Sequence, residues 1–111
     1  MKVLNKPDQA LNIIGLAYRA RKVITGEDTV LRLLKQNKLK SVFVASDAAS
    51  RTIDKFEKKC FYYKTPLIIN YNTAELSNAV GKPMCKILAI TDQGFLDALM
   101  KSLNGGAINE G

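Results

Sequence analysis

The residues from 18 to 32 combine three features that suit a phosphate backbone. The stretch reads Tyr-Arg-Ala-Arg-Lys-Val-Ile-Thr-Gly-Glu-Asp-Thr-Val-Leu-Arg: cations come first, then a short β-prone run, then Gly26 before a predicted helix. Cationic side chains bind phosphates directly, and the free backbone N–H groups at a helix start bind anions. The main positive cluster is Arg19, Arg21, Lys22 and Arg32.

The turn from Gly81 to Lys86 is a second candidate surface. It reads Gly-Lys-Pro-Met-Cys-Lys, so two cations enclose three side chains of apolar character. Apolar side chains of this sort can pack on an unstacked base, which is how RNA loops and bulges are usually read. An ordinary connection from a helix to a strand would have the same composition, and that alternative stays open.

The net charge of +7 is concentrated in the first third of the chain. Residues 1–40 carry nine Lys or Arg against three Asp or Glu, whereas residues 41–111 carry eight against seven. A one-sided excess favours a polyanionic partner over mere solubility, which mixed signs would supply equally well. A solvated basic face is the alternative, because Asp28 and Arg32 are spaced to pair on one helix.

Composition argues against an enzyme, a metal site or a cofactor. The chain has no histidine, which removes the commonest general base and the commonest metal ligand. Cys60 and Cys85 are its only cysteines, and they lie too far apart in sequence for a Cys-x-x-Cys pair. We therefore expect two reduced thiols, no metal, no cofactor and no small-molecule substrate.

Nucleotide and phosphoryl chemistry have only weak candidates. Gly81-Lys82 lacks the upstream glycine and the following Ser or Thr of a phosphate-binding loop, and no Gly-x-Gly-x-x-Gly occurs. Asp47 and Asp92 each follow a predicted strand, where an acidic pair could hold a divalent ion or accept a phosphoryl group. Both also begin a turn into a helix, and we favour capping for both.

Periodicity predicts alternating helices and strands. Helices are expected at 7–18, from 26 to about 36 after a Thr25/Asp28 capping box, from about 50 to 60, at 73–80 and from 92 to 103, with strands at 23–25, 41–45, 66–70 and 86–91. This order indicates a three-layer α/β/α sandwich around a small mixed four-stranded sheet. We expect one domain over 1–103 and a flexible tail over 104–111.

No apolar run approaches the roughly 18 to 20 residues that a membrane span needs. The N-terminal residues lack the apolar stretch and the cleavage pattern of a secretory signal. We therefore expect a cytoplasmic protein without a membrane partner, and a monomer.

Four stretches, taken in order, resemble the ribosomal L-seven-Ae superfamily and, within it, the small bacterial YlxQ-like proteins. They are residues 15–27 (Gly-Leu-Ala-Tyr-Arg-Ala-Arg-Lys-Val-Ile-Thr-Gly-Glu), 42–49 (Val-Phe-Val-Ala-Ser-Asp-Ala-Ala), 75–82 (Glu-Leu-Ser-Asn-Ala-Val-Gly-Lys) and 88–95 (Leu-Ala-Ile-Thr-Asp-Gln-Gly-Phe). The order and spacing of all four make the likeness specific, and it covers nearly the whole chain up to about Leu103.

The resemblance implies an α/β/α sandwich that binds kink-turn RNA, a duplex with a sharp bend at an internal bulge. In that family RNA meets the junction before the second helix and the loop before the last strand. The matching positions are Arg21, Lys22, Gly26, Glu27, Asp28, Thr29 and Arg32 for the first segment and Lys82, Pro83, Met84, Cys85 and Lys86 for the second. Where such binders commonly carry Asn-Glu or Lys-Gln and then a lysine, this chain has Asp28, Thr29 and Arg32.

The sequence thus leads to one main hypothesis and one from a different class. The first is a non-catalytic, ribosome-associated protein that recognises bent or bulged RNA by its shape, clamping the backbone with cations while Met84 packs on an extruded base. The second is a protein-interaction module that keeps the fold and uses its basic face for an acidic partner.

Overall fold

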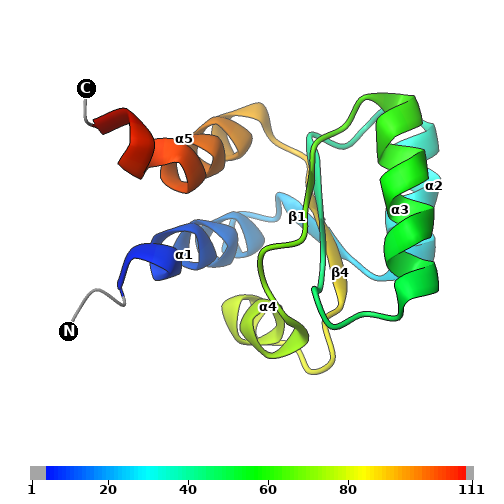
Figure 1. Cartoon of the computed structure of the whole chain (residues 1–111), viewed down its shortest axis with the longest axis horizontal. Coiled ribbons are helices and arrows are strands. Elements are labelled where there is room, and N and C mark those ends of the chain that lie inside the picture. The colour runs from blue at the N-terminus through cyan, green and yellow to red at the C-terminus, as the bar shows by residue number, and fades with distance from the viewer. Residues whose placement is uncertain (1–4, 110–111) are drawn as a thin grey trace.

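The computed structural model describes residues 5–109, and the surroundings of side chains from 9 to 103. Nine elements follow one another in the described chain, with helices and strands alternating (Figure 1). In chain order they are α1 (Asn5–Arg19), β1 (Val23–Thr25), α2 (Glu27–Lys35), β2 (Ser41–Val44), α3 (Ser50–Tyr63), β3 (Leu67–Ile68), α4 (Thr73–Val80), β4 (Ile87–Ile90) and α5 (Gln93–Asn109).

The four strands form one mixed sheet in the order β1-β4-β2-β3. Strand β4 runs antiparallel to both of its neighbours, β1 and β2, while β3 runs parallel to β2. Every residue of β2 and β4 is buried, because helices cover both faces of these central strands. The expected mixed four-stranded sheet is confirmed.

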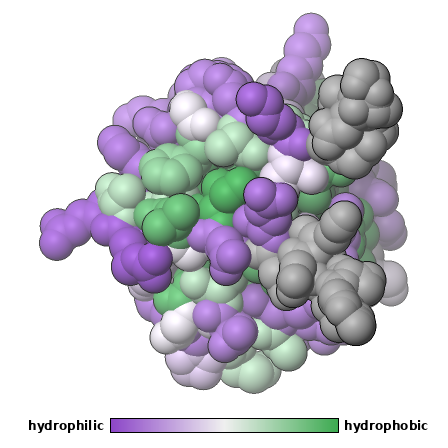
Figure 2. Space-filling view, turned by 90° about the vertical axis from the view of Figure 1, so that its left-hand side faces the viewer, coloured by the Kyte–Doolittle hydropathy of each residue, from purple (hydrophilic) through white to green (hydrophobic). Residues whose placement is uncertain are grey.

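Helices α2 and α3 cover one face of the sheet, and α1, α4 and α5 cover the other (Figure 1). Helices α1 and α4 approach closely: a Cβ added at Gly15 would stand 3.0 Å from the carbonyl oxygen of Ala79. The surface formed on the α1/α4/α5 side has apolar residues toward its middle and hydrophilic residues around them (Figure 2). The architecture is the expected three-layer α/β/α sandwich.

The core lies on both sides of the sheet. Phe43 of β2, Leu34 of α2 and Phe56 of α3 are almost fully buried, as are Ile14 of α1 and Leu99 of α5. Burying a side chain of this size stabilises the fold by about 1.5–3 kcal/mol relative to leaving it exposed. The helices are thus fixed against the sheet at both layers, which gives the loops between them a rigid support.

Three details differ from the sequence predictions. The strand expected over 66–70 is reduced to Leu67–Ile68, because it lies at the sheet edge and pairs only with β2. The capping box expected at Thr25 and Asp28 does not form: Gly26 is the N-cap of α2, and no side chain within the described residues caps it. Helix α5 continues to Asn109, past its expected end near Leu103.

Of the flexible tail expected over 104–111, residues 104–109 belong to α5, and residues 110 and 111 lie outside the described residues.

Candidate nucleic-acid interface

Three helices begin at the edge of the sheet that is formed by strand ends. Strands β1, β2 and β3 all finish at this edge, and α2, α3 and α4 begin just beyond them. Strand β4 starts here, and the loop from Lys82 to Lys86 precedes it. In Figure 1 this edge is at the bottom, where the yellow loop lies below the sheet. The carboxyl ends of strands are where open α/β sheets usually bind ligands.

The two candidate segments meet at this edge, although more than fifty residues separate them. Together they line a hollow of about 560 Å³. Seven of the residues expected at the site are in its lining: Gly26, Glu27, Lys82, Pro83, Met84, Cys85 and Lys86. The hollow also contains residues that the sequence did not mark: Thr25, Ala48, Ala49, Thr52 and Ile87. We call it the junction hollow.

Gly26 holds the first segment in place. Its backbone has φ 98° and ψ 138°, a conformation essentially restricted to glycine. Its N–H donates to the carbonyl oxygen of Ile87 at 3.1 Å, which ties the start of α2 to the start of β4. This bond sets the helix start beside the Lys82–Lys86 loop.

Two helix N-termini bordering the junction hollow lack side-chain caps among the described residues. They belong to α2, whose N-cap is Gly26, and to α3, whose N-cap is Ala49. Helix α4, in contrast, has a complete capping box, in which Asn72 and Glu75 bond reciprocally at 2.9 Å. The uncapped N–H groups and the positive ends of the α2 and α3 dipoles favour an anion in the hollow.

The loop before β4 presents Met84 to solvent and keeps Cys85 inside. Pro83 and Met84 form a turn in which Met84 has φ 54°, and 72% of its surface is exposed. A positive φ after proline is the pattern of a type II turn, which glycine or asparagine normally fills. The N–H of Cys85 donates to Ser77 Oγ at 2.8 Å and anchors the loop to α4.

Both cysteines are free thiols, as expected, and both are buried. Burial raises the pKa of Cys60 to about 11 and also raises the pKa of Cys85. Neither thiol is a ready nucleophile near neutral pH, because the thiolate is the reactive form.

Glu27, which lines the junction hollow, pairs with a lysine, and Asp47, which directly precedes the lining residue Ala48, accepts hydrogen bonds. Lys55 Nζ lies 2.6 Å from Glu27 Oε2 across the gap between α3 and α2. Asp47 Oδ1 accepts hydrogen bonds from the N–H and the hydroxyl of Thr73, and these bonds, with a smaller contribution from Lys86, lower the pKa of Asp47. Lys82 and Lys86 remain exposed, which leaves the loop side of the hollow positive.

Five residues expected at the site lie outside the junction hollow. Asp28 and Arg32 line a separate shallow hollow of about 400 Å³ on the outer side of α2, together with Leu31, Lys35 and Gln36. Arg21 and Lys22 precede β1, so they lie at the other end of this strand, about 13 Å from Gly26 along it. Thr29, the remaining predicted residue, is half-buried on α2 and does not line the junction hollow.

The two aspartates weighed for metal or phosphoryl chemistry act as caps. Asp92 Oδ2 accepts from the N–H of Phe95 at 3.0 Å at the start of α5, as predicted. Asp47 caps a different helix from the one expected, since its partner Thr73 begins α4 rather than α3. Within the described residues no group of three or more His, Cys, Asp or Glu could hold a metal ion, and no helix is long and apolar enough to span a membrane.

Sequence reasoning missed the contribution of α3 and of the two residues before it. Ala48, Ala49 and Thr52 form one wall of the junction hollow, and Lys55 neutralises Glu27. Small residues at a helix start give no signal of their own, and no periodicity relates Lys55 to a partner 28 positions earlier. Only the packing of α2 beside α3 brings these residues to the site.

Comparison with known proteins places the chain among relatives. The model of the ribosomal protein L7Ae/L30e/S12e/Gadd45 family matches residues 8–100. The RNA-binding protein YlxQ of Bacillus subtilis (strain 168) is 40% identical over 92 residues, which cover 83% of this chain and 92% of that protein. The RNA-binding protein YlxQ of Enterococcus faecium is 39% identical over 97 residues, covering 87% and 93%.

Two solved structures share the fold. A protein of unknown function from Bacillus halodurans C superposes with a TM-score of 0.82 at 31% identity, covering 86% of this chain and 97% of that one. The Giardia lamblia 15.5kD RNA binding protein superposes with a TM-score of 0.77 over 96% of this chain and 89% of its own, at 14% identity. At that identity the second likeness concerns the fold alone.

Proposed function

This chain belongs to the ribosomal protein L7Ae/L30e/S12e/Gadd45 family, and from that premise we propose that it is a non-catalytic protein that binds bent or bulged RNA of the kink-turn type. The observation that carries the proposal is the junction hollow, where the Gly26–Glu27 segment and the Lys82–Lys86 loop meet. The names of the two YlxQ relatives as RNA-binding proteins support the choice of ligand.

Each wall of the hollow has a distinct role in this proposal. The uncapped starts of α2 and α3 receive phosphate oxygens through backbone N–H groups, and Lys82 and Lys86 neutralise phosphates from the loop side. Met84, exposed between the two lysines, packs against a base extruded at the bend. Because the contacts are mostly to the backbone, recognition depends on RNA shape more than on sequence.

The pairing of Glu27 with Lys55 removes an obstacle to this arrangement. An isolated carboxylate at the start of α2 would repel phosphate, and Lys55 lies 2.6 Å from it. The pair also fixes the start of α2 against α3 and so keeps both helix N-termini facing one hollow. The same proposal includes a monomeric protein that acts in the cytoplasm in association with the ribosome.

Gel-shift titration against two RNAs of equal length tests the proposal. One RNA contains a kink-turn and the other is a straight duplex, and both are titrated at about 0.15 M salt, where the Debye length is about 8 Å. We expect the bent RNA to bind at least about tenfold more tightly, a difference of about 1.4 kcal/mol. Equal affinities would overturn shape recognition, and tight binding of an acidic peptide in place of either RNA would favour the protein-interaction hypothesis.

A further inference from the structure

The end of α3 exposes aromatic side chains that the junction hollow does not use. Phe61, Tyr62 and Tyr63 follow one another, and Phe61 is 86% exposed while Tyr62 is 75% exposed. Tyr62 and Tyr63 meet edge to face, with ring centroids 4.8 Å apart and an interplanar angle of 85°. Neither Phe61 nor Tyr62 packs in the hydrophobic core. Core packing therefore does not explain why aromatic residues occupy these exposed positions.

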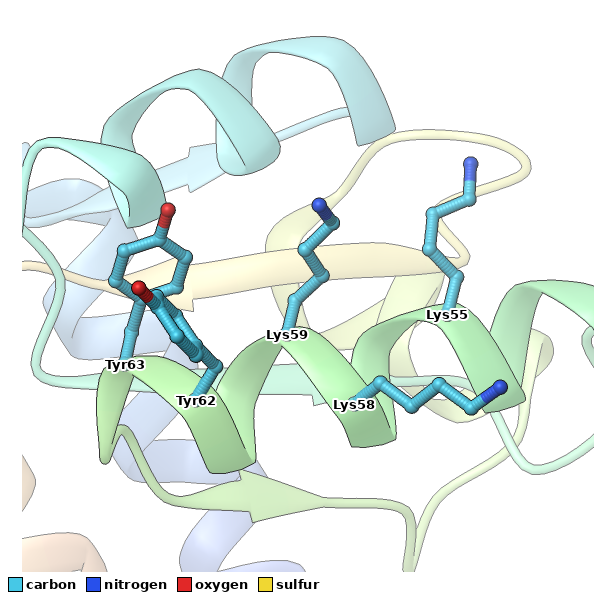
Figure 3. A pocket seen from close by; sticks show the side chains of 5 residues that line it. All are labelled: Lys55, Lys58, Lys59, Tyr62 and Tyr63. Carbon is cyan, nitrogen blue, oxygen red and sulfur yellow. The ribbon is translucent and has the colours of Figure 1, made fainter.

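Three lysines lie beside Tyr62 and Tyr63. Lys55, Lys58, Lys59, Tyr62 and Tyr63 line a shallow hollow of about 500 Å³ along α3 (Figure 3). The spacing explains the arrangement: Lys55, Lys59 and Tyr63 stand four residues apart and form one stripe on the helix, and in Figure 3 they project to the same side. Lysines and aromatic rings therefore share one surface, with the lysines along the helix and the two tyrosines at its end (Figure 3).

Tyr62 has open space on two sides. Besides the lysine-lined hollow, it lines a second one of about 530 Å³ with Cys60, Phe61, Lys64, Thr65 and Pro66. A ring flanked in this way is accessible to a flat partner, and the edge-to-face contact with Tyr63 holds its orientation.

We propose that this aromatic and basic face of α3 binds an unpaired stretch of RNA, with bases stacked on Phe61 and Tyr62 and phosphates neutralised by Lys58 and Lys59. The proposal rests on the proposed function in taking RNA as the polyanion. Platforms for single strands combine these two elements, because every base has a flat face and every linkage has a charge. A duplex keeps its bases stacked inside and would leave the rings unused.

Charge argues against a second copy of this chain as the occupant. The segment from Ser50 to Lys64 carries five Lys or Arg and two Asp or Glu, so two such faces would bring like charges together. The partner that suits the face is anionic and also offers flat apolar surfaces. An unpaired RNA strand has both properties at every nucleotide.

The face is continuous with the junction hollow. Thr52 lines that hollow, and Lys55 lies one turn further along the same helix. From Thr52 to Tyr62 the helix rises about 15 Å, so a strand leaving the bend of the RNA can follow α3 to the aromatic residues. One RNA molecule can thus occupy both surfaces.

Binding of two RNAs that differ in one segment tests the inference. One is a blunt kink-turn and the other carries an additional run of eight unpaired uridines. We expect the extension to increase the affinity of the native chain at least about tenfold. The double change Phe61→Ala and Tyr62→Ala should remove that increase, while the affinity for the blunt RNA stays the same. Tyr62→Phe should retain the increase, because stacking needs the ring and not the hydroxyl.

Two controls keep the outcome interpretable. Leu16→Ala removes a half-exposed apolar side chain from the other side of the sheet, and Lys101→Ala removes an exposed lysine of α5; neither should change the increase. Ultraviolet cross-linking of a uridine 12-mer should label the peptide that contains Phe61–Tyr63. An extension without effect, cross-links confined to the Lys82–Lys86 loop, or an acidic peptide that displaces the 12-mer more strongly than RNA does would each overturn the inference.

The inference and the proposed function fail separately. If bent and straight RNA bind equally but the uridine 12-mer still requires Phe61 and Tyr62, then shape recognition at the junction hollow is wrong and the α3 face stands. If bent RNA is preferred and the extension adds nothing, the junction hollow stands and the α3 inference falls.

Discussion

The two ends of strand β1 carry similar positive charge but differ in what surrounds it. At one end Lys82 and Lys86 border the junction hollow, where α2 and α3 begin without a cap from any side chain that the structure describes. At the other end Arg21 and Lys22 follow the last turn of α1, which itself ends in Arg19. The comparison separates cations that face helix starts from cations that face a helix end.

The difference shows that the ability of a basic cluster to bind an anion depends on whether it adjoins the start or the end of a helix. Near the end of α1 the backbone carbonyls are partially negative, so Arg19 and its neighbours stabilise the helix itself. The carbonyl of Lys22 is also occupied, because it accepts a hydrogen bond from the N–H of Thr91 at 2.9 Å. At the junction hollow the helix starts are partially positive and add to the lysines, so phosphate is favoured there.

Removing two cations from each end is the most direct way to break the comparison. Lys82→Ala with Lys86→Ala should weaken binding of kink-turn RNA about 100-fold, because each charge-assisted contact contributes about 1.5 kcal/mol. Arg21→Ala with Lys22→Ala should cost only a few-fold. Fluorescence anisotropy at several salt concentrations measures both, and equal losses for the two pairs would contradict the distinction.

The conformation of Gly26 gives the next largest effect. Gly26→Asn should lower the free energy of unfolding by about 1–3 kcal/mol, because φ 98° with ψ 138° is disfavoured for any side chain. Gly81→Asn is the matched control: Gly81 has φ 74° and ψ 24°, a left-handed conformation that asparagine tolerates. Urea denaturation compares the two, and a smaller loss at Gly26 than at Gly81 would show that the junction relaxes.

Met84 allows stability and binding to be separated. Met84→Gly should leave the free energy of unfolding within about 1 kcal/mol of the native value, because relief of the positive φ offsets the greater freedom of the unfolded chain. The same change should lower the affinity for bent RNA about tenfold, because the contact with the base is lost. Unaltered affinity would remove Met84 from the proposed interface.

The Glu27–Lys55 pair should have a smaller effect. Lys55→Ala leaves Glu27 unneutralised at the hollow, so we expect RNA affinity to fall a few-fold and thermal stability to change by at most about 1 kcal/mol, since both side chains are about two-fifths exposed. The double variant with Glu27→Gln should recover the affinity. A double variant as weak as the single one would mean that Lys55 contacts RNA directly.

Asp47 should give the smallest effect, a difference in stability near neutral pH that disappears in acid. Its pKa is lowered by the hydrogen bonds from Thr73, so the stability it contributes is complete above its unfolded pKa and is lost as the pH falls through its folded pKa, below about pH 4. Thermal unfolding of the native chain and of Asp47→Asn from pH 6 to pH 3 should therefore converge at the acid end. Parallel curves would contradict this role.

The order of elements and the two site segments could be predicted from the sequence because each depends on local patterns. The buried strands expected at 41–45 and 86–91 are largely apolar runs. Gly26 marks the start of α2, and Gly81 marks the end of α4. The likeness to a known family then linked the two segments. Seven of the twelve predicted site residues do line one hollow.

Tertiary information was needed for the rest. Arg21 and Lys22 are close to Gly26 in sequence, but the extended strand β1 separates them, so they lie at its opposite end. Arg32 shares a helix with Glu27 yet projects from its outer side. The wall supplied by Ala48, Ala49 and Thr52 depends on how α3 packs beside α2, and no pattern in the chain specifies that contact.

The brevity of the outer strands has a consequence for assembly. Strand β1 has three residues and β3 has two, and these are the edges of the sheet. Edges this short offer few unpaired backbone groups to another chain, so growth of the sheet by strand addition and the aggregation that accompanies it are disfavoured. A protein that gathers on a polyanion at high local concentration can therefore stay in solution while its helices and loops make the contacts.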